Sequence, residues 1–274
     1  MIQHHIKEVK AATFCVQLPN SPHHKLPAPV GTGFFVSQDG WFVTAAHVVT
    51  QDGTPTGKPR TDLNEVWLQK ETYFADSSSF VMGAMCPGIE GLAHVEPTLD
   101  FALLKVDFEK NKMREGFKTR SGFPYLTISR RNLEEGEEVF SFGYPLSSIA
   151  VKPLGEGGEI GELSLSPRTT SAIVSSHIEC ATGFMSPALP KAYVLDKALN
   201  YGNSGGPILA SATGHVHAFC SRFQPFYVPQ AHLAPPGGQA PLVMSPSLYG
   251  IVVRLNNRAI LAELGKRGIT VSEE

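Results

Sequence analysis

The sequence predicts an all-β fold made of two units of strands and closed by a single helix. Short runs rich in Val, Ile, Phe and Tyr recur between turn signals along most of the chain, a rhythm typical of strands. The 274 residues include 26 glycines and 21 prolines. Together these two residue types make up more of the chain than their average combined share of about 12%. The chain therefore turns often and leaves little room for long helices.

The first set of predicted strands contains a well-marked hairpin. The runs of this set are residues 12–18, 33–36, 41–45, 65–68 and 101–106. Asp39 and Gly40 stand between two of these runs, and both residue types tolerate the positive φ that a tight hairpin turn requires. We therefore predict that the second and third runs pair as an antiparallel hairpin.

The second set of predicted strands follows a polar connection. Residues 109–122 are polar, carry five basic side chains and divide the strand runs into two roughly equal sets. We therefore interpret them as the link between the two units; the alternative is a solvated loop within one barrel. The runs beyond the link are residues 138–142, 171–178, 192–195, 207–209, 215–220 and 249–254.

Only the end of the chain indicates a helix, at about residues 256–267. Asn256 or Asn257 can cap its start, and Gly265 or Gly268 can end it, because Asn favours the N-cap and Gly the position after the last turn. The apolar stripe between these signals consists of Ile260, Leu261 and Leu264.

Composition excludes several classes of function. The formal charge of −2 at pH 7 provides no basic field to hold a nucleic-acid backbone. No apolar run approaches the roughly 18 to 20 residues that span a bilayer, and the first residues lack the apolar centre of a signal peptide. We therefore expect a soluble, cytoplasmic protein without a nucleic-acid or membrane partner, although trimming of the chain would remove any export signal.

The cysteine and histidine patterns predict no metal or other cofactor. Cys15, Cys86, Cys180 and Cys220 form no C-x-x-C pair, so we expect buried free thiols. The adjacent pairs His4-His5 and His23-His24 are expected in solvated segments. His215 and His217 share one face of a predicted strand, which we interpret as a partly exposed face rather than as a metal site.

A glycine-rich turn contains the candidate nucleophile, Ser204. The stretch Gly202-Asn-Ser-Gly-Gly-Pro207 leaves the serine hydroxyl little shielded and lets successive backbone N–H groups converge. A nucleophile beside an oxyanion hole requires both features. A plain turn is the alternative for this motif taken alone.

Two further residues can complete a catalytic triad. His47 ends the apolar run that begins at Trp41, and Asp100 is a lone carboxylate at the head of an apolar strand. A serine hydroxyl needs a histidine base held in one tautomer by a carboxylate, and the chain order His, Asp, Ser is one of the known orders of that triad. His94, the competing base, lies in a predicted loop that offers nothing to orient it.

With these residues the sequence resembles the trypsin-like, chymotrypsin-fold serine proteases. The motifs are Thr44-Ala-Ala-His47, Asp100-Phe-Ala-Leu-Leu and Gly202-Asn-Ser-Gly-Gly-Pro. The nearest branch in pattern is the bacterial HtrA/Deg protease domain, through Gly31-Thr-Gly-Phe-Phe and Gly136-Glu-Glu-Val-Phe-Ser-Phe-Gly-Tyr-Pro. The resemblance implies one peptidase domain over residues 1–274 and peptide hydrolysis through an acyl-enzyme.

The same resemblance implies how the chain is divided. It implies a double β-barrel with an N-terminal barrel at about 10–108, the connection at 109–122, a C-terminal barrel at about 123–254 and the closing helix. HtrA members usually continue into PDZ domains, whereas this chain ends shortly after the helix. Regulation through PDZ modules is therefore not expected.

Three departures from the animal digestive members are informative. Those relatives carry a cysteine directly after the histidine and another four residues before the serine, where this chain has Val48 and Asn200. They also carry an aspartate directly before the serine, where this chain has Asn203. The flanking disulfides and the zymogen ion pair of those relatives are therefore not expected here.

The resemblance also assigns roles and a substrate pocket. It implies Ser204 as nucleophile, His47 as base and then acid, Asp100 as its orienting partner, and the N–H groups of Gly202 and Ser204 as oxyanion donors. The predicted pocket residues are Ala198, Leu199, Cys220 and Ser221.

These pocket residues predict cleavage after a small or medium apolar residue. Ala198, at the expected pocket floor, provides no carboxylate to pair with a basic substrate side chain. Asp196 and Arg222 lie close enough to leave other preferences open. The long Pro-rich segment 221–247 is hypothesised to overhang the cleft.

The sequence therefore predicts a serine endopeptidase that acts on protein or peptide substrates. The alternative is a protease-like module that binds a peptide without cutting it. No pattern in the chain specifies the oligomeric state, the activating signal or the physiological substrate.

Overall fold

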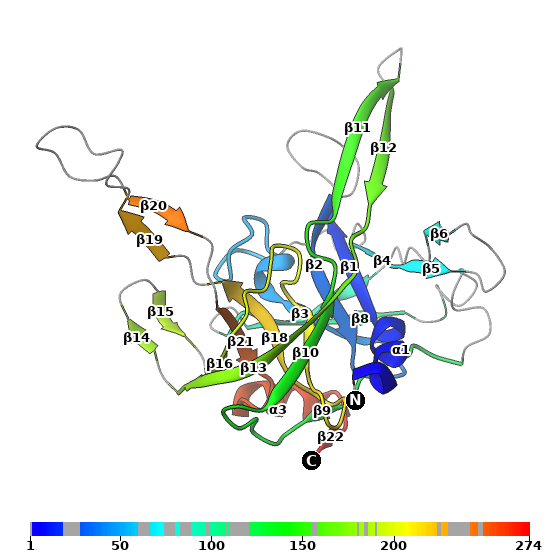
Figure 1. The fold of residues 1–274 in the computed structure, drawn as a ribbon. Helices are drawn as coiled ribbons and strands as arrows, with labels where there is room; N and C mark the ends of the chain where they lie inside the picture. The colour runs from blue at the N-terminus through cyan, green and yellow to red at the C-terminus, as the bar shows by residue number, and fades with distance from the viewer. Residues whose placement is uncertain are drawn as a thin grey trace, which may run out of the picture.

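Two packed β-sheets form the body of the protein in a computed structural model (Figure 1). The structure describes residues 2–18, 28–59, 66–73, 80–82, 89–96, 99–107, 109, 121–154, 158–179, 181–183, 186–189, 191–223, 226–229, 242–245 and 249–274. The predicted connection therefore lies mostly outside the described residues, as do His23, His24, Cys86 and Cys180.

The first sheet has six strands in the order β4-β1-β2-β3-β8-β7. Their bounds are β1 Thr13–Leu18, β2 Ala28–Phe35, β3 Trp41–Ala45, β4 Trp67–Gln69, β7 Ile89–Glu96 and β8 Phe101–Val106. The predicted hairpin is confirmed, because β2 and β3 pair with Phe35 opposite Phe42 and Gly40 has a φ of 103° in the turn. His94 lies in β7, so its predicted placement in a loop is wrong.

The second sheet closes on itself. Its order is β17-β10-β13-β16-β21-β18-β9-β22, and β17 also pairs with β18, which joins six strands into a ring. The bounds are β9 Ile128–Ser129, β10 Glu138–Gly143, β13 Arg168–Ile178, β16 Ala192–Leu195, β17 Pro207–Ala210, β18 Val216–Phe223, β21 Gly250–Arg254 and β22 Val271–Ser272. The all-β, chymotrypsin-like fold class is thus confirmed, while the exact barrel boundaries stay a prediction.

Aromatic side chains join the two sheets. One buried cluster includes Phe14 and Phe101 from the first sheet together with Phe140 and Phe219 from the second. The rings of Phe101 and Phe219 lie 6.0 Å apart between centroids. This contact brings β8 and β18 together, so that the start of β8 at Phe101 lies beside the middle of β18 at Phe219. The cleft described below forms there.

The closing helix is confirmed as α3, Arg258–Lys266, with the side chain of Asn257 accepting a hydrogen bond from the Ala259 N–H. A second helix, α1 (Ile2–Ala12), was not predicted. Among its residues, Val9 and Ala12 are buried, and the Lys70 ammonium donates to the Ala11 carbonyl at 3.0 Å. Packing against β1 and β10 therefore stabilises a helix that lacks a strong capping sequence.

His4 and His5 lie on this helix rather than on flexible chain. His4 is exposed, as expected for a solvated segment, and His5 is partly buried. The His5 ring packs against Gly214 so closely that a Cβ there would lie 2.4 Å from its Nδ1. His217 also differs from its prediction: it is buried, with 1% of its surface exposed. Cys15 and Cys220 are buried free thiols, as expected.

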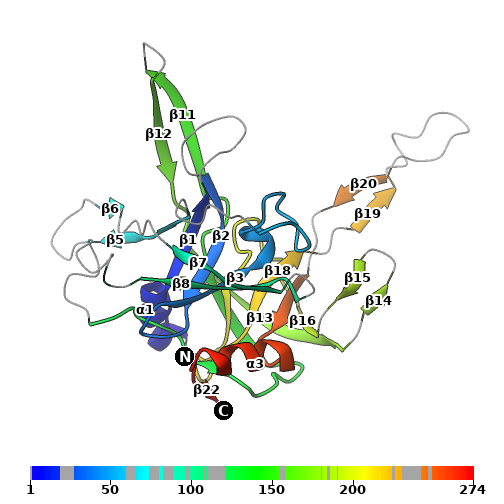
Figure 2. The same cartoon turned by 180° about the vertical axis from the view of Figure 1, so that it is seen from behind.

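Within the described residues, four two-stranded ribbons extend from the body, and none was predicted (Figures 1 and 2). Their strands are β5 Glu71–Tyr73, β6 Phe80–Met82, β11 Ser148–Leu154, β12 Gly158–Ser164, β14 Ala181–Gly183, β15 Ser186–Leu189, β19 Phe226–Pro229 and β20 Leu242–Ser245. The pair β19–β20 lies within segment 221–247 and reaches outward from the end of β18.

Candidate active site

His47 and Asp100 are brought together by the ends of two neighbouring strands. β3 ends at Ala45 and continues into a short 3-10 helix, η1 (Ala46–Val48), while Asp100 directly precedes β8. Because Ala45 pairs with Phe101 across the sheet, the two side chains meet. His47 Nδ1 lies 3.0 Å from Asp100 Oδ1 and 2.9 Å from Oδ2.

The Asp100 carboxylate is buried and accepts hydrogen bonds from several sides. It is 1% exposed, and the backbone N–H of His47 donates to Oδ1 at 3.0 Å. The Ser221 hydroxyl donates to Oδ2 at 2.5 Å. Since a carboxylate only accepts, His47 presents an Nδ1–H to it and keeps the lone pair on Nε2 for use as a base.

Asp100 has an unusual backbone conformation. Its φ is 53°, and among the described non-glycine residues only Leu146 shares a positive φ. Asp tolerates this left-handed region better than most residues, and the Asp100 carbonyl accepts the Ala46 N–H at 2.8 Å. This local turn directs the carboxylate back under His47.

Ser204 lies in the glycine-rich turn between β16 and β17 in the second sheet. Gly202 and Gly205 have φ values of 94° and 84°, and a Cβ at either position would lie 2.5 Å or less from a backbone oxygen. The turn is joined to β18 by the Gly205 N–H, which donates to the Cys220 carbonyl at 2.7 Å. Only glycine allows this close approach, which accounts for the motif.

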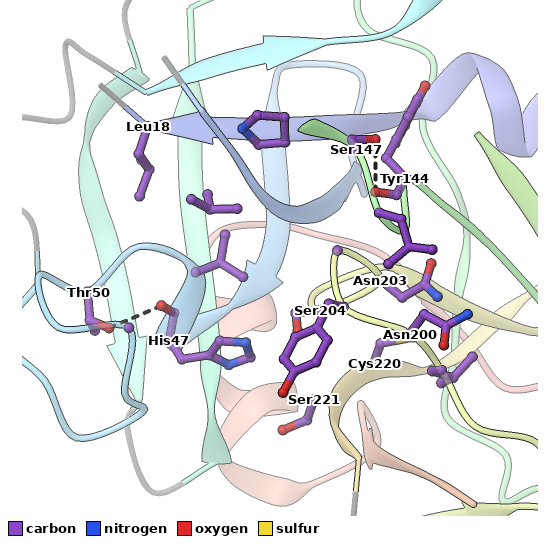
Figure 3. Close-up of a pocket in the computed structure, with 18 of the residues that line it drawn as sticks. Leu18, His47, Thr50, Tyr144, Ser147, Asn200, Asn203, Ser204, Cys220 and Ser221 are labelled. Carbon is purple, nitrogen blue, oxygen red and sulfur yellow. Dashed lines mark hydrogen bonds between the residues drawn. The ribbon is translucent and has the colours of Figure 1, made fainter. Parts of the chain in front are cut away.

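The three predicted triad residues and Gly202 meet at one cleft. His47, Gly202, Ser204 and Ser221 line a cleft of about 610 Å³, and Asp100 lies directly behind His47. Figure 3 shows the His47 ring pointing toward Ser204 across this cleft, with Ser221 below it. His47 comes from the first sheet and Ser204 from the second, so the cleft lies between the sheets.

The predicted pocket residues are only partly brought together. Leu199, Cys220 and Ser221 line the cleft, whereas Ala198 is not among its described lining residues. The Asp196 carboxylate accepts the Ile173 N–H at 2.8 Å and is exposed. The Arg222 side chain and the side chains of β19 and β20 lie outside the description, and no described residue of that ribbon lines the cleft.

Cys220 is an inert wall of this cleft. It is 2% exposed, and burial raises the pKa of its thiol to about 12, partly offset by a contact with the Ser141 hydroxyl. A thiol with so high a pKa carries almost no thiolate at neutral pH. Ser204 is therefore the nucleophile candidate that the geometry favours.

Sequence reasoning assigned Ser221 to the pocket and missed its contact with Asp100. It also missed Thr32, a buried residue of β2 whose N–H donates to the Ser204 carbonyl at 2.8 Å. Both residues are separated from their partners by more than 100 positions of chain, so no local pattern could have revealed these contacts.

Comparisons with known proteins identify the family of this chain. The trypsin-like peptidase domain family matches residues 31–218. A probable periplasmic DegP-like serine endoprotease of Bartonella henselae is 28% identical over 187 residues, covering 68% of this chain and 26% of that protein. Serine protease HTRA1 of Xenopus tropicalis is 27% identical over 187 residues, with 68% and 30% covered.

A solved structure supports the fold. An HtrA-type protease, an AlgW variant with one serine replaced by alanine and with a tripeptide, superposes with a TM-score of 0.53 at 14% identity, covering 98% of this chain and 64% of that one. The resemblance to trypsin-like, HtrA-type protease domains is thus confirmed. The chain spans only 26% to 30% of the length of the curated relatives compared here.

The cytoplasmic prediction is contradicted by these relatives. The DegP-like proteins of Bartonella and Brucella are named as periplasmic, and serine protease HTRA2 of Bos taurus is named as mitochondrial. An opening sequence without a signal peptide was a weak basis for that prediction. No helix in the described part of the chain has the length and apolar character to span a membrane.

Proposed function

This chain belongs to the trypsin-like peptidase domain family, and from that premise we propose that it is a serine endopeptidase acting through Ser204, His47 and Asp100. The observation that carries the proposal is that the Asp100 carboxylate accepts hydrogen bonds from both His47 and Ser221. The carboxylate holds Nδ1 of His47 and thereby turns Nε2 toward the cleft that Ser204 lines.

Catalysis begins when His47 Nε2 takes the proton of the Ser204 hydroxyl. The serine oxygen then attacks the peptide carbonyl carbon, and the resulting oxyanion accepts hydrogen bonds from the N–H groups of Gly202 and Ser204. When the tetrahedral intermediate collapses, the imidazolium of His47 gives its proton to the leaving amine. A water activated by the same imidazole releases the acyl group and restores the serine.

Asp100 contributes by stabilising the imidazolium as it forms. Its carboxylate is buried and already hydrogen-bonded to His47 and Ser221, so little reorganisation needs to accompany the proton transfer. The Ser221 hydroxyl donates a further hydrogen bond to Oδ2, the same buried oxygen that His47 Nδ1 contacts at 2.9 Å.

We also propose cleavage after a small or medium apolar residue. The Leu199 side chain lines the cleft and packs against Gly250, where a Cβ would lie 3.1 Å from Leu199 Cγ. The Asp196 carboxylate is engaged with the Ile173 backbone, so it does not serve as a partner for a basic substrate residue. An apolar lining residue such as Leu199 favours apolar substrate side chains, at about 1 to 3 kcal/mol per methylene.

Like its periplasmic relatives, the protein is proposed to act on protein or peptide substrates outside the cytoplasm. Fractionation of cells that express the full-length protein tests its location. Recovery with a cytoplasmic marker alone would contradict this part of the proposal.

The decisive experiment is labelling with a fluorophosphonate probe, followed by mapping of the modified peptide. We expect a single adduct on Ser204 and hydrolysis of an unstructured protein such as casein. Peptide binding without labelling or cleavage would instead support a binding module. Profiling on a peptide library tests the pocket separately, because dominant cleavage after Arg or Lys would overturn the pocket assignment and leave the triad intact.

A further inference from the structure

Four consecutive carbonyl groups of the nucleophile turn each accept a hydrogen bond. The Tyr201 carbonyl accepts the Leu146 N–H at 2.9 Å, and the Asn203 carbonyl accepts the Gly206 N–H at 2.7 Å. The other two are held by one residue: the Thr32 hydroxyl donates to the Gly202 carbonyl at 2.6 Å, and the Thr32 N–H donates to the Ser204 carbonyl at 2.8 Å.

Fixed carbonyls determine where the oxyanion donors point. In a planar trans peptide the C=O and the following N–H are antiparallel. Holding the Tyr201 carbonyl therefore directs the Gly202 N–H, and holding the Asn203 carbonyl directs the Ser204 N–H. Thr32 holds the peptide planes that follow Gly202 and Ser204, so each donor residue is fixed on both sides.

The Thr32 hydroxyl also connects this turn to a second one. It accepts the Tyr144 N–H at 3.1 Å, and Tyr144 starts the turn that carries Leu146. The Tyr144 carbonyl in turn accepts the Ser147 hydroxyl at 3.1 Å. One hydroxyl thus joins Gly202 directly and Tyr201 through the neighbouring turn.

The surroundings of Thr32 exclude substitutes for this hydroxyl. Thr32 is fully buried. Glycines surround it, and a Cβ at Gly143 would lie 3.1 Å from Thr32 Oγ1 and one at Gly206 3.3 Å from its Cγ2. Loss of the hydroxyl would therefore remove the donor to the Gly202 carbonyl and an acceptor of the Tyr144 N–H at the same time, which is costly.

We propose that Thr32 is a positioning residue of the active site, whose hydroxyl aligns the oxyanion donors of Gly202 and Ser204 without touching the substrate. This inference rests on the proposed function. Only Ser and Thr provide both a donor and an acceptor one bond from Cβ, so serine should replace threonine here and valine should not.

The test compares Thr32→Val and Thr32→Ser with the wild type. A matched control is Thr13→Val, because Thr13 is also a fully buried threonine of the first sheet, and its hydroxyl has no partner among the described residues. Kinetics on an apolar peptide substrate give kcat and KM. Inhibition by a peptidyl boronate, which forms a tetrahedral adduct, reports on the oxyanion donors.

We expect Thr32→Val to lower kcat by about 10- to 100-fold, less than the loss of a donor itself, with KM changed by less than about twofold. Boronate affinity should fall by a similar factor to kcat. Thr32→Ser should retain most of the wild-type kcat, and Thr13→Val should match the wild type. A structural role alone would lower stability without this separation of kcat from KM.

Hydrogen–deuterium exchange over residues 198–206 provides a readout independent of activity. Faster exchange in Thr32→Val, with wild-type exchange in Thr32→Ser, supports the inference. If the wild type is active and Thr32→Val retains more than half of its kcat, the inference is overturned and the proposed function stands. If the wild type neither labels nor cleaves, the proposed function fails, and unchanged exchange in Thr32→Val would then overturn the inference as well.

Discussion

The two halves of the candidate site hold their chemical groups by opposite means. In the first sheet, His47 and Asp100 are fixed through their side chains, because the carboxylate is surrounded by donors. In the second sheet, Ser204 is fixed through main-chain carbonyls, and its hydroxyl faces the cleft. The difference follows from the chemistry of the two groups. A carboxylate orients a histidine best when hydrogen bonds to its oxygens hold it in place, whereas a nucleophile must stay accessible to the substrate.

Removing the accessible hydroxyl gives the largest expected effect. Ser204→Ala should lower kcat by roughly 10⁴- to 10⁶-fold and change the free energy of unfolding little, because Ser204 lines the open cleft. Peptidase assays and urea unfolding measure the two quantities. Retention of more than a few per cent of turnover would show that another residue is the nucleophile. His94→Ala, a substitution of the competing base, should leave kcat nearly unchanged.

Disturbing the main-chain frame should cost stability as well as activity. In Gly205→Ala a Cβ would lie 2.2 Å from the Thr32 carbonyl oxygen and 2.7 Å from the Ala45 N, so the unfolding free energy should fall by about 3 kcal/mol. Gly136→Ala is the matched control, because Gly136 also has a positive φ but nothing lies within 4 Å of its Cβ position.

The control variant Gly136→Ala should lose only about 1 kcal/mol of unfolding free energy, which is the cost of placing alanine in a positive-φ conformation. Urea unfolding of both variants gives the difference. Equal losses would mean that the close approach at Gly205 is not what holds the turn.

Acid should lower the stability of the protein through a buried histidine of the second sheet. Burial lowers the pKa of His217, on β18, from 6.5 to about 4, and its Nε2 has no partner among the described residues. Between pH 6.5 and 4, His217 is protonated in the unfolded chain and neutral in the folded protein. The free energy of unfolding should therefore be unaffected above pH 7 and fall by up to about 3 kcal/mol as the pH drops to 4.

His217→Asn tests this expectation, because an asparagine amide can still donate to the Arg131 carbonyl that His217 Nδ1 contacts at 3.0 Å. The variant should show a smaller loss of unfolding free energy between pH 7 and 4 than the wild type. Parallel curves would rule out His217 as the acid-sensitive group.

The smallest effect is expected at Ser221, which couples the two halves. Ser221→Ala removes one of several hydrogen bonds to Asp100, while both contacts from His47 remain. A single hydrogen bond is worth about 1 kcal/mol, so kcat should fall about fivefold with little change in KM. A loss as large as that of Ser204→Ala would place Ser221 in the chemical step itself.

The sequence by itself determined the fold class and the three candidate catalytic residues. His47, Asp100 and Ser204 stand in strong local contexts, two at the ends of apolar strands and one among glycines, and each context is readable within a few residues. The hairpin at Gly40 and the helix capped by Asn257 follow from turn and capping chemistry. Local propensities and short-range backbone needs suffice for features of this kind.

Only the tertiary structure decided what surrounds these groups. The contacts of Ser221 with Asp100 and of Thr32 with Gly202 join distant segments, and α1 is stabilised by packing and by Lys70 rather than by its own sequence. His217, predicted to lie on a partly exposed strand face, is likewise buried by the fold. Long-range hydrogen bonds and burial depend on which strands become neighbours, and that arrangement is a property of the whole fold rather than of any local stretch of sequence.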